Sequence, residues 1–149
     1  MSDDILRLKC DLSAALAGLE EAEASILRSI EKGMAVVVLD TLGESMRNAP
    51  ILTGNLRGSG SARINGQQVG HTTNSDGSNS VETDAYSPKG TETIVRGEVG
   101  FDCEYALVQH EHIEFNHPRG GKAKFLEDTL KEKSGDYEAV IGECIRGEL

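Results

Sequence analysis

Aromatic residues are scarce in this 149-residue sequence: tryptophan is absent, and aromatic side chains occupy 4% of the positions. Apolar residues as a whole reach 38%, so a core built from this chain is mostly aliphatic and small. Such a core suits one thin layer of helices on one sheet and disfavours a deep enzyme pocket. At this length we expect a single domain spanning residues 1–149.

Cysteine, positive charge and long apolar runs are also in short supply. Cys10, Cys103 and Cys144 are far apart and form no C-x-x-C pair, so we expect no disulfide framework and a reducing compartment. A formal net charge of −10 disfavours free binding to nucleic acid, because neutralising phosphates requires a basic surface. The N-terminal residues do not indicate a signal peptide, and the most apolar run, 34–39, is far shorter than a membrane span.

Two different periods of apolar residues predict the order of helices and strands. Between about 14 and 48 apolar residues recur every three or four positions, as in an amphipathic helix that ends before Pro50. From Leu56 to Ile64 they alternate strictly with polar residues, as in a half-buried strand. The same reasoning predicts strands at 5–11, 67–71 and 95–101, a hairpin turn at Asn65-Gly66, and a helix from 124 onward that Ser134-Gly135 could interrupt.

The predicted order, β-α-β-β-loop-β-α, is that of an α+β domain: a long N-terminal helix packed on a small antiparallel sheet, with a C-terminal helix. The inner positions of the 56–64 strand are mostly small, which predicts that another element packs very close to its backbone. Residues 72–91 are polar and rich in Ser, Thr, Gly and Asn, and we expect them to form a long flexible loop.

Residues 105–118 hold three of the four histidines and raise the question of a metal site. In a strand, His110, His112 and Glu114 would share a face, and three such ligands would suit zinc or iron. The H-E-x-x-H pattern fails, because its second histidine would stand where the chain has Glu114. In a helix, His110 and His112 would lie on different faces. Surface or interface histidines, with no metal and no cofactor, are therefore the favoured interpretation, and His117 belongs to the same group.

No nucleophile stands in a recognisable catalytic motif. Ser59, Ser61 and Cys103 lie in no nucleophile elbow. The glycine-rich stretch at 119–122 lacks the spacing of a phosphate-binding loop. The sequence therefore gives no catalytic residue, and we do not expect an enzyme.

The stretch 49–64 resembles the P-x-x-T-G-x-L-R-x-S signature of small neck and tail-completion proteins of long-tailed bacteriophages, often called minor capsid or head–tail joining proteins. The matching residues are Pro50, Thr53, Gly54, Leu56, Arg57 and Ser59. A second family block, roughly V-G-x-x-x-x-Y-A-x-x-x-E, is matched by Val99, Gly100, Tyr105, Ala106 and either His110 or Glu111. A third block, at a helix start, is matched by Lys124, Phe125, Leu126 and Leu130. The resemblance covers about residues 6–131, with the blocks in the family's order.

This resemblance implies a structural virion protein: one subunit of a ring, expected to be a hexamer, at the head–tail neck. Its partners would be a portal or head-completion protein and a tail tube or tail terminator protein, with DNA passing through the ring and no membrane involved. The protein would be found in the virion and, during assembly, in the host cytoplasm. The chain departs from the family after Glu111, where residues 113–117 replace a frequent Gly-Thr. Two alternatives stay open: a small metal-dependent enzyme using His110, His112 and His117, and a cytoplasmic adaptor module.

Overall fold

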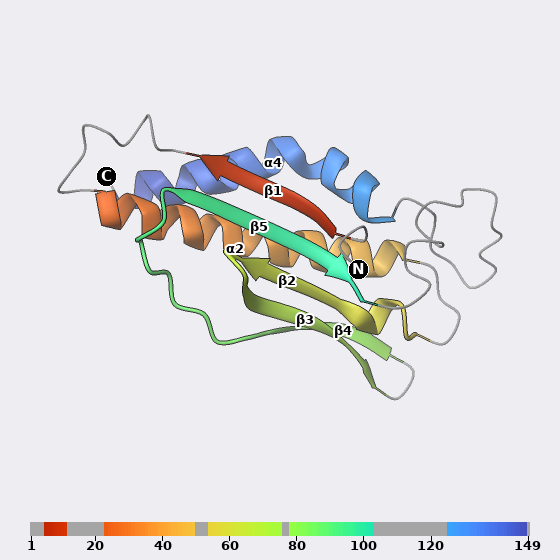
Figure 1. Ribbon diagram of the computed structural model, residues 1–149. Coiled ribbons are helices and arrows are strands. Elements are labelled where there is room, and N and C mark those ends of the chain that lie inside the picture. Colours follow the sequence, from red (N-terminus) through yellow and green to blue (C-terminus); the bar gives the residue numbers. More distant parts are fainter. Residues whose placement is uncertain (1–4, 12–22, 50–53, 76–77, 103–124, 149) are drawn as a thin grey trace.

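A computed structural model describes residues 5–11, 23–49, 54–75, 78–102 and 125–148 (Figure 1). In chain order they form β1 Ile5–Asp11, α2 Glu23–Asn48, the 3-10 helix η2 Arg57–Ser59, β2 Gly60–Ile64, β3 Gln67–Ser75, β4 Ser78–Thr83, β5 Ile94–Phe101 and α4 Phe125–Glu148. The predicted α+β arrangement, with a long helix before an antiparallel sheet and a second helix after it, is confirmed.

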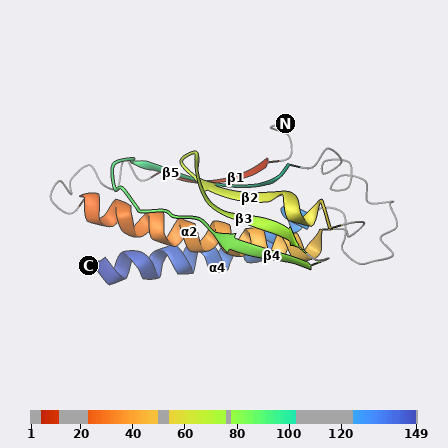
Figure 2. The ribbon, with the colours of Figure 1, turned by 90° about the horizontal axis from the view of Figure 1, so that it is seen from below.

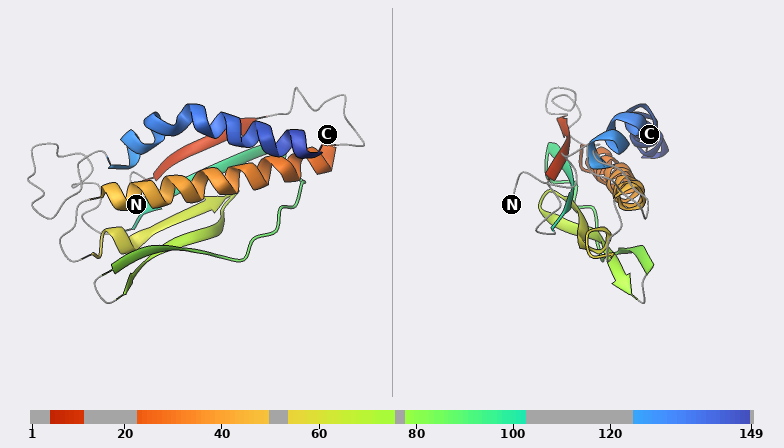
Figure 3. Two further views of the ribbon diagram at one scale, coloured as in Figure 1. Left: turned by 180° about the vertical axis from the view of Figure 1, so that it is seen from behind. Right: turned by 90° about the vertical axis from the view of Figure 1, so that its right-hand side faces the viewer.

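The sheet has the strand order β1-β5-β2-β3-β4, and every neighbouring pair is antiparallel. Both long helices cover the same face of this sheet, as the views from below and along the molecule show (Figures 2 and 3). α2 packs against β5 and β2, and α4 packs mainly against α2. The opposite face of the sheet is covered by none of the described helices.

α2 lies close to the sheet because glycines occupy inner positions of two central strands. A Cβ atom at Gly97 of β5 would come within 2.5 Å of Val38 Cγ1 and 2.7 Å of Met34 Sδ, both on α2. A Cβ atom at Gly60 of β2 would come within 2.7 Å of Leu42 Cδ1. The prediction that an element packs against the small inner residues of the 56–64 stretch is confirmed at Gly60, where that element is α2. Gly58 lies in η2 instead, and a Cβ atom there would come within 2.6 Å of Asn74 Cβ on β3.

The rest of the core is aliphatic, as the composition predicts. It includes Ile30, Val37 and Leu42 of α2, Ala62 and Ile64 of β2, and Val95 and Val99 of β5. Two buried phenylalanines, Phe101 and Phe125, contact each other at one end of this core.

The predicted 14–48 helix is confirmed from Glu23 to Asn48, and residues 14–22 lie outside the described residues. α4 runs without a break through Ser134-Gly135, so the interruption suggested there does not occur. Among the described residues, no helix is both long enough and apolar enough to cross a membrane.

The strand predicted over 56–64 is wrong in its first part. Residues Arg57–Ser59 form η2, and β2 begins only at Gly60. The N–H of Gly58 donates to the carbonyl of Gly54 at 2.9 Å, so this backbone is used within a turn and not in the sheet. The alternation of buried and less buried residues holds from Gly60 onward.

The predicted hairpin turn at Asn65-Gly66 is confirmed. Asn65 has φ +48° and Gly66 has φ +85°, and these two residues connect β2 directly to β3. Positive φ at both central residues is the requirement of a type I′ turn, which Asn-Gly meets best.

The long loop predicted over 72–91 is wrong in its first half. β3 continues to Ser75, and β4 pairs with it antiparallel at the edge of the sheet. Thr73 Oγ1 lies 2.9 Å from Ser80 Oγ across the two strands. Polar side chains that hydrogen-bond each other across a hairpin stabilise it in a way that composition alone does not reveal.

Residues 84–92, the second half of that stretch, are irregular and are attached to α2 by a buried carboxylate. Glu31 of α2 is 4% exposed and accepts hydrogen bonds from the Tyr86 hydroxyl at Oε1 and from the Gly90 N–H at Oε2, both at 2.7 Å. Burial, together with the hydrogen bond to Glu31, raises the pKa of the Tyr86 hydroxyl. Gly90 has φ +70°, and a Cβ there would lie 2.4 Å from the carbonyl oxygen of Ala24.

Candidate functional site

Arg57, the arginine of the stretch that resembles the neck-protein signature, caps the C-terminus of α2. Its Nε donates to the carbonyl of Ala49 and its Nη2 to the carbonyl of Arg47, both at 2.8 Å. The last carbonyls of a helix have no intrahelical partner, so a guanidinium that bonds two of them stabilises the helix end. Partial burial in this position lowers the pKa of Arg57, although the side chain stays charged.

The other described residues of the first signature block build the turn that carries Arg57. Gly54 has φ +86°, and a Cβ there would lie 2.7 Å from Asn74 Oδ1. Leu56 is 2% exposed and belongs to the core. The Ser59 hydroxyl donates to the carbonyl of Leu56 at 2.7 Å, which closes η2. Pro50 and Thr53 lie outside the described residues.

The described parts of the three signature blocks meet at one end of the molecule, where α2 ends, β2 begins, β5 ends and α4 begins (Figures 1 and 3). The N–H of Asp102, next to the second block, donates to the carbonyl of Ser59 at 2.9 Å. The rings of Phe101 and Phe125 meet edge to face, with centroids 5.3 Å apart and an interplanar angle of 84°. Leu126 is also buried there.

Five of the remaining predicted site residues fall on the part of the chain outside the described ranges. They are Tyr105, Ala106, His110, Glu111 and Lys124. The histidines proposed as metal ligands, His110, His112 and His117, also lie there, with Glu114. Within the described ranges, no group of three or more His, Cys, Asp or Glu side chains is arranged to hold a metal ion.

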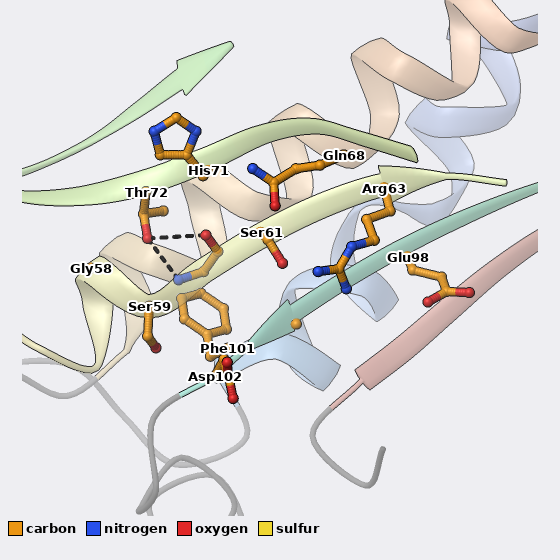
Figure 4. Close-up of a pocket in the computed structure, with 12 residues that line it drawn as sticks. Gly58, Ser59, Ser61, Arg63, Gln68, His71, Thr72, Glu98, Phe101 and Asp102 are labelled. Atoms are coloured by element: carbon orange, nitrogen blue, oxygen red, sulfur yellow. Dashed lines mark hydrogen bonds between the residues drawn. The ribbon is translucent and has the colours of Figure 1, made fainter. Parts of the chain in front are cut away.

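Next to the signature turn, the open face of the sheet forms a shallow concavity of about 460 Å³ (Figure 4). Its lining is mainly polar and comes from η2, β2, β3, β5 and the residue after β5, and it includes Ser59, Ser61, Arg63, Gln68, His71, Glu98 and Asp102. Small residues such as Ser61 and Gly100 line it beside longer charged side chains. Cationic and anionic groups alternate on this face, which suits contact with a polar surface better than enclosure of an apolar ligand.

His71 is the one histidine within the described residues, and the motifs in the sequence did not draw attention to it. Its Nδ1 lies 3.0 Å from Asp84 Oδ1, and its Nε2 lies 3.5 Å from Glu82 Oε2. Gln68 Nε2 donates to Asp84 Oδ2 at 2.9 Å. The hydrogen bonds from Gln68 and from His71 lower the pKa of Asp84. With a carboxylate beside each of its ring nitrogens, His71 is engaged in fixing the end of β4 to β3.

Period-two reasoning could not have placed Gln68 and His71 together, because positions three apart point to opposite faces of a regular strand. The register shifts between Ala62 and Arg63, so that Arg63 pairs with Gln68 whereas Ser61 pairs with His71. This bulge puts one additional residue into β3 and returns both side chains to the open face. Irregularities of this kind have no clear signal in the amino-acid pattern.

Comparisons with known proteins found no relative: no family model matches the chain, and no curated protein and no solved structure matches it.

Replacing Arg57 with alanine is expected to lower the free energy of unfolding by about 2 kcal/mol, because two charged hydrogen bonds to helix carbonyls are lost. Arg63→Ala is the matched control: it removes the same charge from β2, where Arg63 lines the polar concavity and does not cap a helix. Urea titration followed by circular dichroism gives both values. Equal losses in the two variants would contradict the capping role.

Proposed function

We propose that this protein is a structural virion protein, a subunit of the ring that joins the phage head to the tail and lets DNA pass. The observation that carries the proposal is the meeting of the three signature blocks. Segments around 54–59, 99–102 and 125–126 are far apart in the sequence and are tied together by the Ser59–Asp102 hydrogen bond and the Phe101–Phe125 contact.

The roles of these residues support a structural function rather than a chemical one. Gly54 supplies the turn, Leu56 the core contact and Arg57 the helix cap. The Ser59 hydroxyl donates its proton to a carbonyl, which is the opposite of what an activated nucleophile requires. A motif whose described residues form a turn, fill the core and cap a helix fits a family defined by its assembly.

The charge of the chain is compatible with a conduit for DNA. A net charge of −10 repels phosphates, so a ring of such subunits would let DNA slide without gripping it. The proposed partners are the portal or head-completion protein on one side and the tail tube or tail terminator protein on the other. Rings of this type close by heterologous contacts, in which one patch of a subunit meets a different patch of the next.

The test is a phage that carries this gene with an early stop codon, grown with and without a complementing plasmid. We expect filled heads and finished tails that fail to join, counted by electron microscopy, and joined particles on complementation. Antibody labelling of complete virions should place the protein at the neck. Normal virions without the protein would refute the proposal. A stoichiometric metal, lost with an activity on replacing His110 and His112, would favour the enzyme instead.

A further inference from the structure

Among the described residues, the two edge strands of the sheet, β1 and β4, each have a neighbouring strand on one side only. All four pairs in the order β1-β5-β2-β3-β4 are antiparallel, so β1 and β4 run in the same direction. An edge strand presents a row of backbone N–H and C=O groups that can pair with another chain. Along β4, Ser78, Ser80 and Glu82 are exposed.

The two edges carry opposite charge. β1 has Arg7 and Lys9, with Asp11 at its last position, and pairs in register with Arg96 and Glu98 of β5. β4 has Glu82, whose side chain is 62% exposed, and no basic residue. Asp84 follows directly after β4. By its residues, β1 is therefore net basic, and the stretch from β4 to Asp84, which lies beside His71, is net acidic.

We propose that the β4 edge of one copy of this chain pairs with the β1 edge of the next copy, which extends the sheet from subunit to subunit. Like charges that face each other across strands are destabilising, and opposite charges are favourable. Pairing β4 with β4 would bring two Glu82 carboxylates together, and pairing β1 with β1 would bring Arg7 and Lys9 near their own copies. Only the unlike pairing places basic residues against acidic ones.

Charged side chains at sheet edges also protect a protein against unwanted association, and this protection is an alternative explanation for the charges on β1 and β4. Protection would work with either sign on either edge. It gives no reason for one edge to be basic and the other acidic, whereas pairing between unlike edges requires it. The direction of the strands is also compatible with pairing between unlike edges. When neighbouring copies have the same orientation, β4 of one copy and β1 of the next are parallel neighbours.

An unlike pairing is heterologous, and a heterologous contact yields a closed ring if the rotation between copies closes. Five strands at a spacing of about 4.8 Å make each subunit about 24 Å wide. Six copies would then give a sheet with a circumference of about 145 Å and a backbone diameter of about 46 Å, which leaves room for a DNA duplex. The ring size depends on the proposed function, but the edge pairing itself does not.

The experiment uses two full-length variants with reversed edges. In the first, Ser80→Lys and Glu82→Lys make the β4 edge basic. In the second, Arg7→Glu and Lys9→Glu make the β1 edge acidic. Sedimentation velocity at low salt, from micromolar to millimolar protein, measures self-association, and circular dichroism confirms folding. We expect the wild-type chain to form concentration-dependent oligomers larger than dimers, and each variant alone to associate at least ten-fold more weakly.

An equimolar mixture of the two variants should recover association to within about two-fold of the wild-type chain, because each basic edge then meets an acidic edge. Recovery on mixing cannot arise from misfolded subunits. Glu92→Lys and Lys131→Glu are the controls, since each reverses one charge away from both edges, and they should associate as the wild-type chain does.

Three results would overturn the proposal: a wild-type chain that stays monomeric at millimolar concentration, a variant that associates normally by itself, or a mixture that fails to recover. The second result would indicate pairing between like edges, because the unaltered edge would then suffice. If association recovers on mixing but virions lack the protein at the neck, the edge pairing stands and the proposed function fails.

Discussion

Replacing Glu31 with alanine is expected to detach residues 84–92 from α2 and to lower the free energy of unfolding by about 3 kcal/mol. The carboxylate is buried and accepts hydrogen bonds from the Tyr86 hydroxyl and the Gly90 N–H, each at 2.7 Å. Without it, both donors lose their acceptor. The buried Gly90 N–H then carries the full penalty of desolvation, and the half-buried Tyr86 hydroxyl carries part of it. The hydrogen exchange of the Gly90 amide should accelerate together with that of its neighbours.

Glu92→Ala is the matched control, because this carboxylate follows in the same segment and is exposed. It should change the free energy of unfolding by less than about 0.5 kcal/mol and leave the Gly90 amide protected. Denaturant titration gives the stabilities, and hydrogen exchange followed by mass spectrometry gives the protection. An unchanged Gly90 exchange rate in Glu31→Ala would show that other contacts hold the segment.

The second large effect is expected at Gly97, where valine should destabilise the domain by about 3 kcal/mol. Its Cβ atom would overlap Val38 Cγ1 and Met34 Sδ, so α2 would have to move away from the sheet or adopt strained rotamers. Valine otherwise favours strands, so a loss of stability at this position would result from the lack of space and not from a low strand propensity.

Two further variants separate crowding from other causes. Ser61→Val places the same side chain on the open face of β2, where none of the described helices packs, and should leave stability within about 1 kcal/mol of the original. Val38→Ala combined with Gly97→Val should recover part of the loss, because the first change makes the room that the second needs. Additive losses in the double variant would contradict the close packing of α2 on β5.

Local features of this chain were predictable from the amino-acid pattern. The Asn65-Gly66 turn depends on the positive φ angles of two residues, and an Asn-Gly dipeptide adopts these angles with little strain. The strict alternation from Gly60 to Ile64 and the helical stripe over Glu23–Asn48 report which side faces the core. The small inner residues predicted a closely packed neighbour, although not which one.

The candidate site was predictable only in part. Gly54 and Arg57 were singled out as members of a motif, but their roles, a left-handed turn and a helix cap, became evident from the carbonyl groups they contact. His71 was overlooked, because its neighbours Glu82 and Asp84 lie in β4 and directly after it, and because a bulge alters the alternation of β3. Each of these arrangements joins residues that the sequence separates.

The amino-acid sequence by itself determined the α+β class, the two long helices, the β2–β3 hairpin and the small residues beneath α2, because these follow from short-range periodicity, turn preferences and side-chain volume. The tertiary structure alone decided that β4 pairs with β3, that Glu31 holds residues 84–92, and that β1 and β4 become sheet edges of opposite charge. Those features depend on hydrogen bonds and strand neighbours between distant segments. Such partners compete with water and with one another until the whole chain has packed, so no local pattern specifies them.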